Sequence, residues 1–164
     1  MLSKKIQEAI NLQINEELYS SYLYLSMAAH FDAMNLSGFA HWMKVQANEE
    51  NTHAMKFYSY IYDRGGVVVL RAIPMPPTKF KTPPDIFKQV LVHEQKITQL
   101  INKLYELAIK EKDYPTEMIL HWFINEQVEE EKNATDIINM LEMIGNTPVS
   151  LIMADRQLGA RKGD

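Results

Sequence analysis

The sequence predicts an all-α protein, a four-helix bundle with one long crossover connection and a short fifth helix near its C-terminal end. Three observations lead to this prediction. Apolar residues recur at helical spacing in four long runs, and clusters of glycine, proline and polar residues separate the runs. One connection is much longer than the other two. The length of 164 residues suits a single domain covering residues 1–164.

The first two apolar runs cover residues 6–31 and 39–61. Residues 35–38 separate them, and Ser37 is expected to cap the second helix because serine side chains accept hydrogen bonds from helix N-termini. Gly65 is expected to end that helix, since glycine readily adopts the left-handed conformation that follows many helices. The short connection at residues 35–38 predicts that the first two helices form an antiparallel pair.

Residues 65–82 carry three prolines and no helical periodicity, and residues 67–70 are expected to be locally extended. A connection of 18 residues can reach about 60 Å when fully extended. Helices of this size are about 40–45 Å long. The connection can therefore run the length of the bundle and make the second and third helices parallel. The alternative is a simple up-and-down bundle with a floppy loop.

The third helix is expected to begin at residues 82–85, where a threonine cap precedes two prolines and an aspartate, and to end near Lys112. The fourth is expected to run from residue 115 to residue 145. Thr147 then caps a shorter helix over residues 148–158, and a polar tail follows. These boundaries give a second antiparallel pair and the short terminal helix.

Composition excludes several classes of function. The net charge of −4 argues against nucleic-acid binding, which needs a basic surface. The absence of cysteine excludes disulfides, zinc ribbons, iron–sulfur clusters and thiol catalysis. No stretch approaches 18 uncharged apolar residues, so no membrane span is expected, and the N-terminal residues lack the uniformly apolar character of a secretory signal. A cytoplasmic location is expected.

A repeated polar motif is the main functional signal. A glutamate is followed 33 residues later by a pair of polar residues spaced three apart, and the whole pattern recurs 77 positions further on. The first set is Glu17, Glu50 and His53, and the second is Glu94, Gln127 and Glu130. Residues three apart share one face of a helix. A glutamate from each of two helices and paired ligands from two others form the ligand set of di-iron carboxylate bundles.

These polar residues occupy positions where the periodicity predicts apolar ones. Glu94 falls on the same stripe as Val90 and Ile97, and Gln127 follows Phe123 on the inward face of its helix. Their distances from the two tight turns place all six near the middle of the bundle. Burying ionised carboxylates costs several kcal/mol each unless cations neutralise them. Oxygen ligands with one imidazole favour iron, manganese or zinc.

The two sets are not equivalent, because Gln127 and Glu130 stand where a glutamate and a histidine stand in the first set. One metal position is therefore expected to be richer in protein ligands, and the second ion more labile. Tyr24 lies two turns after Glu17 on the same face. It is either a core residue or a partner of a ligand carboxylate, through a hydrogen bond or a redox role.

Other polar and aromatic residues have simpler interpretations. Glu49 and the acidic run over residues 126–131 would, considered alone, be solvated surface. The remaining histidines have no matched partners and are expected to pack or to face solvent; they are His30, His41, His93 and His121. Trp122 and the ten methionines are expected to lie in the core.

The chain closely resembles the bacterial non-haem ferritins along essentially its whole length. The resemblance rests on the segments 16–21, 49–53, 93–95, 113–116 and 126–132. It implies a hollow shell of 24 subunits that oxidises Fe(II) with dioxygen and stores the ferric product as a mineral. It also implies that residues 148–158 line a four-fold axis and that residues 65–82 pack across a two-fold axis.

The resemblance also assigns roles residue by residue. It implies one iron site at Glu17, Glu50 and His53, a second at Glu94, Glu130 and the bridging Glu50 with Gln127 close by, and a peripheral third at Glu49, Glu126 and Glu129. Tyr24 matches the tyrosine that lies next to the centre in this family. Glu49, Glu126 and Glu129 thus become candidate ligands through the resemblance alone.

Departures from related families narrow the expectation. Bacterioferritins carry a second Glu-x-x-His and bind haem through a methionine directly after the ligand of the second helix, where this chain has Asn51. No haem is therefore expected. Rubrerythrins need a cysteine site that this chain cannot make. Two other functions remain open, namely a di-iron oxidase or peroxidase that stores nothing, and a helical interaction module whose acids are solvated.

Overall fold

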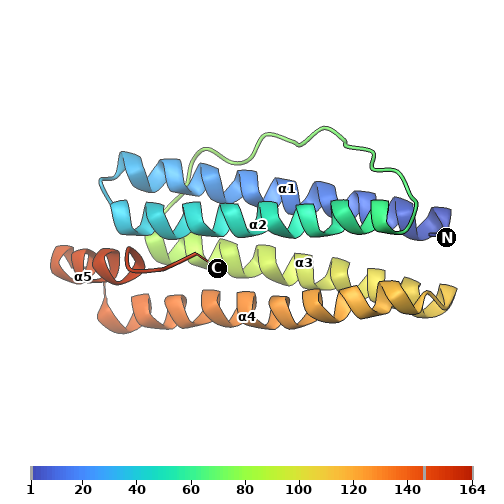
Figure 1. The fold of residues 1–164 in the computed structure, drawn as a ribbon. Helices are drawn as coiled ribbons and strands as arrows, with labels where there is room; N and C mark the ends of the chain where they lie inside the picture. The colour runs from blue at the N-terminus through green and yellow to red at the C-terminus, as the bar shows by residue number, and fades with distance from the viewer. Residues whose placement is uncertain (1, 146, 164) are drawn as a thin grey trace.

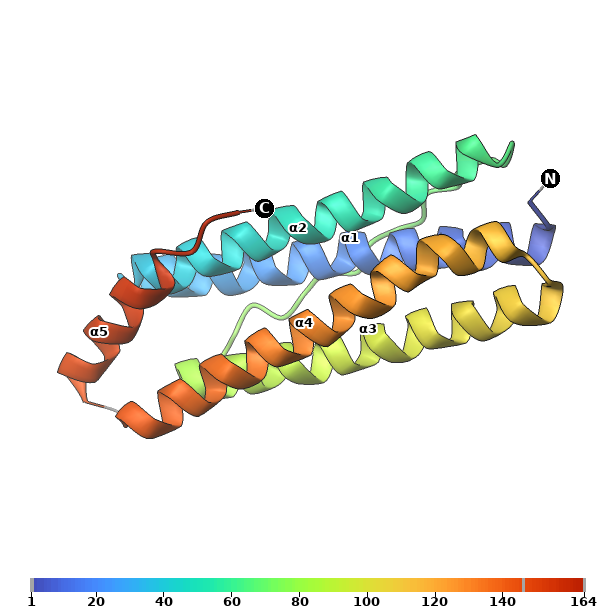
Figure 2. The same cartoon turned by 60° about the horizontal axis from the view of Figure 1, so that its bottom comes forward.

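The structure is a computed structural model that describes residues 2–145 and 147–163, and every regular element among them is a helix. In chain order the helices are α1 (Lys4–Ala33), α2 (Ser37–Asp63), α3 (Pro83–Glu111), α4 (Tyr114–Ile144) and α5 (Pro148–Leu158). The first four form a bundle of two hairpins, and α5 lies at an angle across one end (Figures 1 and 2). The predicted fold class is confirmed. None of these helices is both long and apolar enough to cross a membrane.

The connection between α2 and α3 runs back along α1, so that α2 and α3 point in the same direction (Figure 1). Side chains of α1 hold it by hydrogen bonds to its backbone. The Val67 amide donates to Gln7 Oε1 over 2.9 Å, and the Val69 amide donates to Asn11 Oδ1 over 2.9 Å. Asn11 Nδ2 donates in turn to the Val67 carbonyl over 3.1 Å. The long crossover is thus confirmed, and the floppy loop of the alternative is wrong.

The helix ends follow their local sequence. Thr82 and Asp85 form a reciprocal capping box at the start of α3. Asp113 accepts from the Thr116 amide, so α4 begins one residue earlier than predicted. Gly65, with φ of 70°, follows the end of α2 as expected.

The predicted cap of α2 is wrong, because Ser37 is the first residue of the helix and its side chain does not cap it. Asp155 of α5 replaces it: one carboxylate oxygen accepts from the Gly38 amide at 2.8 Å and from the Phe39 amide at 3.0 Å. The charge also suits the positive end of the helix dipole. The close approach requires glycine, since a Cβ on Gly38 would lie 1.7 Å from the Asp155 carbonyl oxygen.

Gly38→Ala is therefore expected to displace α5, and the backbone amides of residues 150–158 should exchange with solvent much faster while those of α1–α4 stay protected. Asp155→Ala removes only the cap and should cost about 1 kcal/mol of stability. Hydrogen–deuterium exchange read by mass spectrometry measures both. Ser37→Ala is the matched control and should change nothing. Unchanged exchange of α5 in Gly38→Ala would contradict this account of its docking.

The apolar core has two parts, one toward each end of the bundle. The part near α5 includes Phe31, Phe39 and Phe87, all fully buried. The other includes Phe57 and Phe123, whose rings stack with centroids 3.8 Å apart. Between the two parts lies a layer of buried polar side chains from all four long helices.

Two predictions about the core are wrong. Trp122 is 36% exposed. Of the methionines, Met27 and Met43 are buried and Met140 is partly buried, whereas Met34, Met55, Met75, Met118, Met143 and Met153 are exposed. Met1 lies outside the described residues. Methionine is flexible and tolerates many environments, so its presence in an amphipathic helix does not by itself indicate burial.

Candidate metal centre

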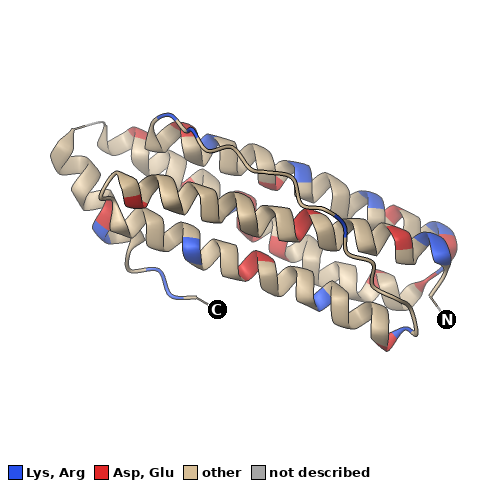
Figure 3. Ribbon diagram, turned by 90° about the horizontal axis from the view of Figure 1, so that it is seen from above, with Lys and Arg blue, Asp and Glu red and all other residues tan. Residues whose placement is uncertain are grey.

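Four buried glutamates and one histidine make up the middle layer of the bundle. α1 supplies Glu17, α2 supplies Glu50 and His53, α3 supplies Glu94, and α4 supplies Glu130; each is at most 5% exposed. Gln127 of α4 is buried beside them. Acidic positions lie along the helices of the bundle and also near its ends (Figure 3). The sequence-predicted set of six is therefore brought into one layer.

Within this layer the ligand atoms fall into two groups that share a residue. Glu17, Glu50 and His53 each offer one atom within 4.8 Å of the others, and so do Glu50, Glu94 and Glu130. Glu50 belongs to both groups, so its two carboxylate oxygens can face two cations at once. The arrangement can hold a pair of metal ions bridged by one carboxylate.

The three acids that the resemblance assigns to a peripheral site are less closely gathered. Glu126 joins His53 and Glu130 in a further group within 4.8 Å. Glu129 is exposed, and Glu49 forms an ion pair with Arg161 from the C-terminal tail. Among the described residues, no potential ligand group contains Glu49 or Glu129.

Two glutamines that sequence reasoning did not assign to the site hold its carboxylates. Gln13 Nε2 donates to Glu17 Oε1 over 2.8 Å. Gln46 Nε2 donates to Glu50 Oε1 over 3.0 Å and to Glu130 Oε2 over 2.8 Å. A signal was present, because each glutamine precedes a glutamate by four residues on an inward face.

Glu94 is held from two sides. The Tyr24 hydroxyl donates to Glu94 Oε1, and Gln127 Nε2 donates to Glu94 Oε2 over 3.1 Å. Gln127 Nε2 also lies 3.3 Å from Thr98 Oγ1. Of the alternatives for Tyr24, the geometry supports the hydrogen bond to a candidate ligand, although the ring is also fully buried. Gln127 uses its amide nitrogen to orient Glu94, and its amide oxygen remains as a possible ligand atom.

Burial makes the layer costly for negative charge. Desolvation, reinforced by Glu50, raises the pKa of Glu17 to about 8. Desolvation and Glu94 raise the pKa of Glu130 to about 8, and desolvation raises that of Glu94 to about 7. The pKa of Glu50 is also raised well above its usual range, first by burial and then by Glu94 and Glu130.

The layer contains features that fit a bound cation. Among the described residues, no lysine or arginine forms an ion pair with these four carboxyls. Glu17 Oε2 is buried and has no hydrogen-bond partner among them. Divalent ions would supply both the missing charge and the missing partner, so the donor set fits metal binding.

His53 is the nitrogen donor of the layer. Its Nδ1 lies 3.3 Å from Glu50 Oε2, and its Nε2 lies 3.9 Å from Glu126 Oε1. The Trp122 ring packs edge-on against the imidazole with centroids 5.4 Å apart, and Lys56 Nζ lies 3.6 Å from the centre of the indole. Trp122 is itself partly exposed, and its ring covers one side of the His53 imidazole.

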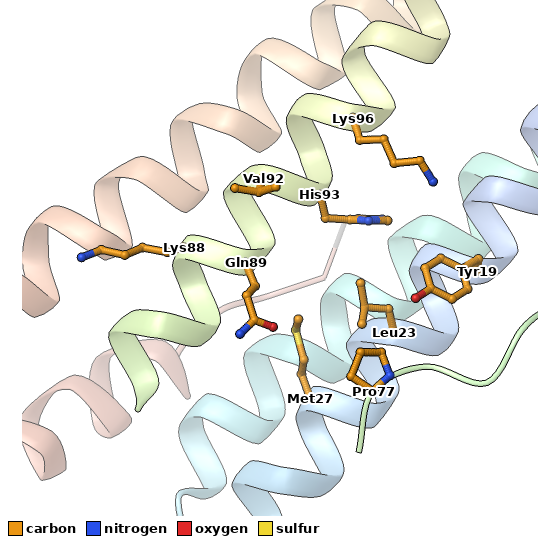
Figure 4. Close-up of a pocket in the computed structure, with 9 residues that line it drawn as sticks. All are labelled: Tyr19, Leu23, Met27, Pro77, Lys88, Gln89, Val92, His93 and Lys96. Carbon is orange, nitrogen blue, oxygen red and sulfur yellow. The ribbon is translucent and has the colours of Figure 1, made fainter. Parts of the chain in front are cut away.

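A groove of about 420 Å³ lies beside the layer, between α1, α3 and the crossover (Figure 4). Its lining residues are Tyr19, Leu23, Met27, Pro77, Lys88, Gln89, Val92, His93 and Lys96. Of the two expected roles for His93, packing and solvent exposure, the structure shows packing: the side chain is buried there, and its Nε2 lies 2.7 Å from Ser20 Oγ. Burial lowers the pKa of His93 to about 4, with a further contribution from Lys96. The groove is mostly apolar and includes none of the candidate ligands.

Comparison with known proteins identifies the family of this chain. Residues 7–144 match the family model of the ferritin-like domain. The bacterial non-haem ferritin of Bacteroides fragilis strain 638R is 43% identical over 161 residues, which cover 98% of this chain and 100% of that protein. That of Staphylococcus aureus strain USA300 is 41% identical over 164 residues, covering 100% and 99%.

Solved structures show the same fold. An engineered closed form of the Archaeoglobus fulgidus ferritin superposes with a TM-score of 0.98 at 44% identity, with complete coverage of both chains. The open-pore ferritin of this hyperthermophilic archaeon superposes with a TM-score of 0.96 at 45% identity, covering 98% of each chain. The chain therefore belongs to the ferritin family of iron-storage proteins and groups with its bacterial non-haem members.

Proposed function

We propose that this chain is a ferroxidase that oxidises Fe(II) to Fe(III) with dioxygen at its mid-bundle layer. We further propose that 24 copies, each a single domain over residues 1–164, form a cytoplasmic shell that stores the ferric mineral. Iron is both substrate and cargo. The observation that carries the proposal is that Glu50 is shared by two buried groups of ligand atoms drawn from four helices.

In this proposal one Fe(II) binds Glu17, Glu50 and His53, and the second binds Glu50, Glu94 and Glu130. Sharing a carboxylate would hold the ions about 3.5–4 Å apart, the separation of other two-metal centres. Each ion loses one electron, and the two electrons with two protons convert dioxygen to hydrogen peroxide. Both ferric ions then leave for the interior of the shell.

The surrounding residues prepare the carboxylates for metal. Tyr24 and Gln127 fix the two oxygens of Glu94, so that the remaining lone pairs have a defined direction. In the metal-free protein the raised pKa values leave Glu17 and Glu130 largely protonated near neutral pH. Entering ions displace these protons, and binding should therefore tighten as pH rises.

A third ion at Glu49, Glu126 and Glu129 also remains a proposal. Glu49 is paired with Arg161, so a metal ion there would have to displace the guanidinium from that carboxylate. Haem binding is not proposed, because Asn51 follows Glu50 where a haem-binding relative has methionine.

Anaerobic titration with Fe(II), followed by aerobic loading and sizing of the purified particle, tests the function. We expect two tightly bound ions per chain, a particle of hundreds of kilodaltons and accumulation of ferric mineral. A small oligomer that turns over dioxygen without retaining iron would instead indicate a non-storing di-iron oxidase. Absence of stoichiometric Fe(II) binding would leave the interaction module as the explanation.

A further inference from the structure

We propose that Arg161 is a positioning residue of the metal centre, acting through Gln46 on two of the carboxylates. Arg161 lies in the tail beyond α5, which carries basic positions and returns along α2 (Figures 1 and 3). This inference rests on the proposed function, because it concerns how the same centre is held ready for metal.

Arg161 is anchored at four points, three on its guanidinium and one on its backbone carbonyl. Nη1 donates to Gln46 Oε1 over 2.8 Å, and Nη2 pairs with Glu49 Oε2. The guanidinium carbon lies 4.4 Å from the centre of the Trp42 ring, a cation–π distance. His41 Nε2 lies 2.8 Å from the Arg161 carbonyl oxygen, which can only accept, so the imidazole donates. Only 17% of the arginine side chain is exposed.

This anchoring determines which way the Gln46 amide faces. Arginine has donors and no acceptor, so the atom of Gln46 that meets Arg161 must be the amide oxygen. The amide nitrogen must then point the other way, and both of its hydrogens have partners there. Gln46 Nε2 donates one hydrogen to Glu50 Oε1, with nitrogen and oxygen 3.0 Å apart, and the other to Glu130 Oε2, with nitrogen and oxygen 2.8 Å apart. Gln46 is 1% exposed, so these bonds are shielded from bulk solvent.

The chain of contacts therefore links the C-terminal tail to the bridging carboxylate. Glu50 belongs to both ligand groups and Glu130 to one of them, and Gln46 orients both. Without Arg161 the amide of Gln46 could rotate and turn its oxygen toward the two carboxylates, which repels their ionised forms. Partners that orient metal ligands typically contribute 10- to 100-fold to metal affinity.

The test is anaerobic titration of the metal-free assembled protein with Co²⁺, whose visible absorption reports coordination, and separately with Zn²⁺. Arg161→Met keeps the aliphatic stem over Trp42 and removes the charge and the donors. We expect it to weaken the ion that binds Glu50, Glu94 and Glu130 by about 10-fold or more and to change its Co²⁺ spectrum. Lys162→Met, which removes the same charge from the neighbouring exposed residue, should titrate as the unmodified protein does.

A double-mutant cycle with Gln46→Leu shows whether Arg161 acts through the amide. If it does, adding Arg161→Met to Gln46→Leu should cause little further loss, whereas additive losses would mean a general effect of charge and overturn the proposal. Unchanged Co²⁺ binding in Arg161→Met would overturn it as well and leave the ferroxidase proposal intact. Failure of the unmodified protein to bind Co²⁺, Zn²⁺ or Fe(II) would overturn both the ferroxidase proposal and the proposed role of Arg161.

Discussion

Glu50→Ala is expected to abolish rapid Fe(II) oxidation while the helices and their assembly remain. Glu50 is the one residue common to both buried ligand groups, so its loss removes a ligand from each ion and the bridge between them. Changes to residues that merely orient ligands already cost about 10- to 100-fold. Loss of the bridge should therefore lower the initial rate by at least about 100-fold. Stopped-flow absorbance of the ferric product after mixing with aerobic Fe(II) measures this rate.

Glu50→Gln separates charge from shape in the same experiment. It retains the size of the side chain and removes the carboxylate, so it should lose activity as Glu50→Ala does. Glu8→Ala removes an exposed acid of α1 and should oxidise iron normally. Size-exclusion chromatography should show the same particle for all three variants. A native rate in Glu50→Ala would show that the site is wrongly assigned.

The metal-free protein is expected to lose stability as pH rises from about 6.5 to 8.5. In the unfolded chain glutamates lose their protons near pH 4.5, whereas in the folded protein the pKa is about 8 for Glu17 and Glu130 and about 7 for Glu94. The folded state therefore holds more protons across this window, and its free energy of unfolding falls with pH. Each unit of pKa shift corresponds to about 1.4 kcal/mol, so the combined change is on the order of several kcal/mol.

His93 makes the slope shallower below this window. Its folded pKa of about 4 lies below the usual value of 6.5, so this residue raises stability as pH increases between those values and opposes the glutamates there. Three glutamates outweigh this single histidine, and above about pH 6.5 its opposing contribution disappears. Urea unfolding in the presence of a chelator, repeated at several pH values, gives the free energy directly.

Divalent ions should reverse the slope, because they bind the ionised carboxylates and are held more tightly as protons leave. Repeating the unfolding series with Zn²⁺ tests this reversal. Glu17→Gln should flatten the metal-free curve by removing one of the titrating groups. A free energy of unfolding that is flat or rises across the window in chelator would contradict the assigned electrostatics.

Local sequence predicted most of the fold. Thr82 and Gly65 mark helix ends through their own backbone neighbourhoods, and a pattern within a few residues is sufficient to recognise them. The cap of α2 was not predictable in this way, because Asp155 is 117 positions away from Gly38 and reaches it only after α5 has docked. A tertiary contact from Asp155 therefore caps α2, where the local sequence had indicated Ser37.

The same distinction applies to the candidate site. The spacing of Glu17, Glu50 and Glu94 on apolar stripes indicated their burial, since helical periodicity alone determines which residues share a face. Helical periodicity does not predict which residues hold these carboxylates in place. Arg161 belongs to a tail with no periodicity, and its contact with Gln46 spans 115 positions. Trp122 was expected in the core, because sequence alone does not distinguish an aromatic ring at the edge of the bundle from one in its interior.

The division of the apolar core into two parts has a consequence for the working cycle of the protein. Each end of the bundle is a cohesive unit, and between them lies the layer of buried carboxyls, whose ionised forms repel one another unless cations are present. In the proposed cycle, the Fe(II) ions that bind this layer would therefore also link the two halves of the core. Loss of the ferric product would remove that link until the next pair of ions binds.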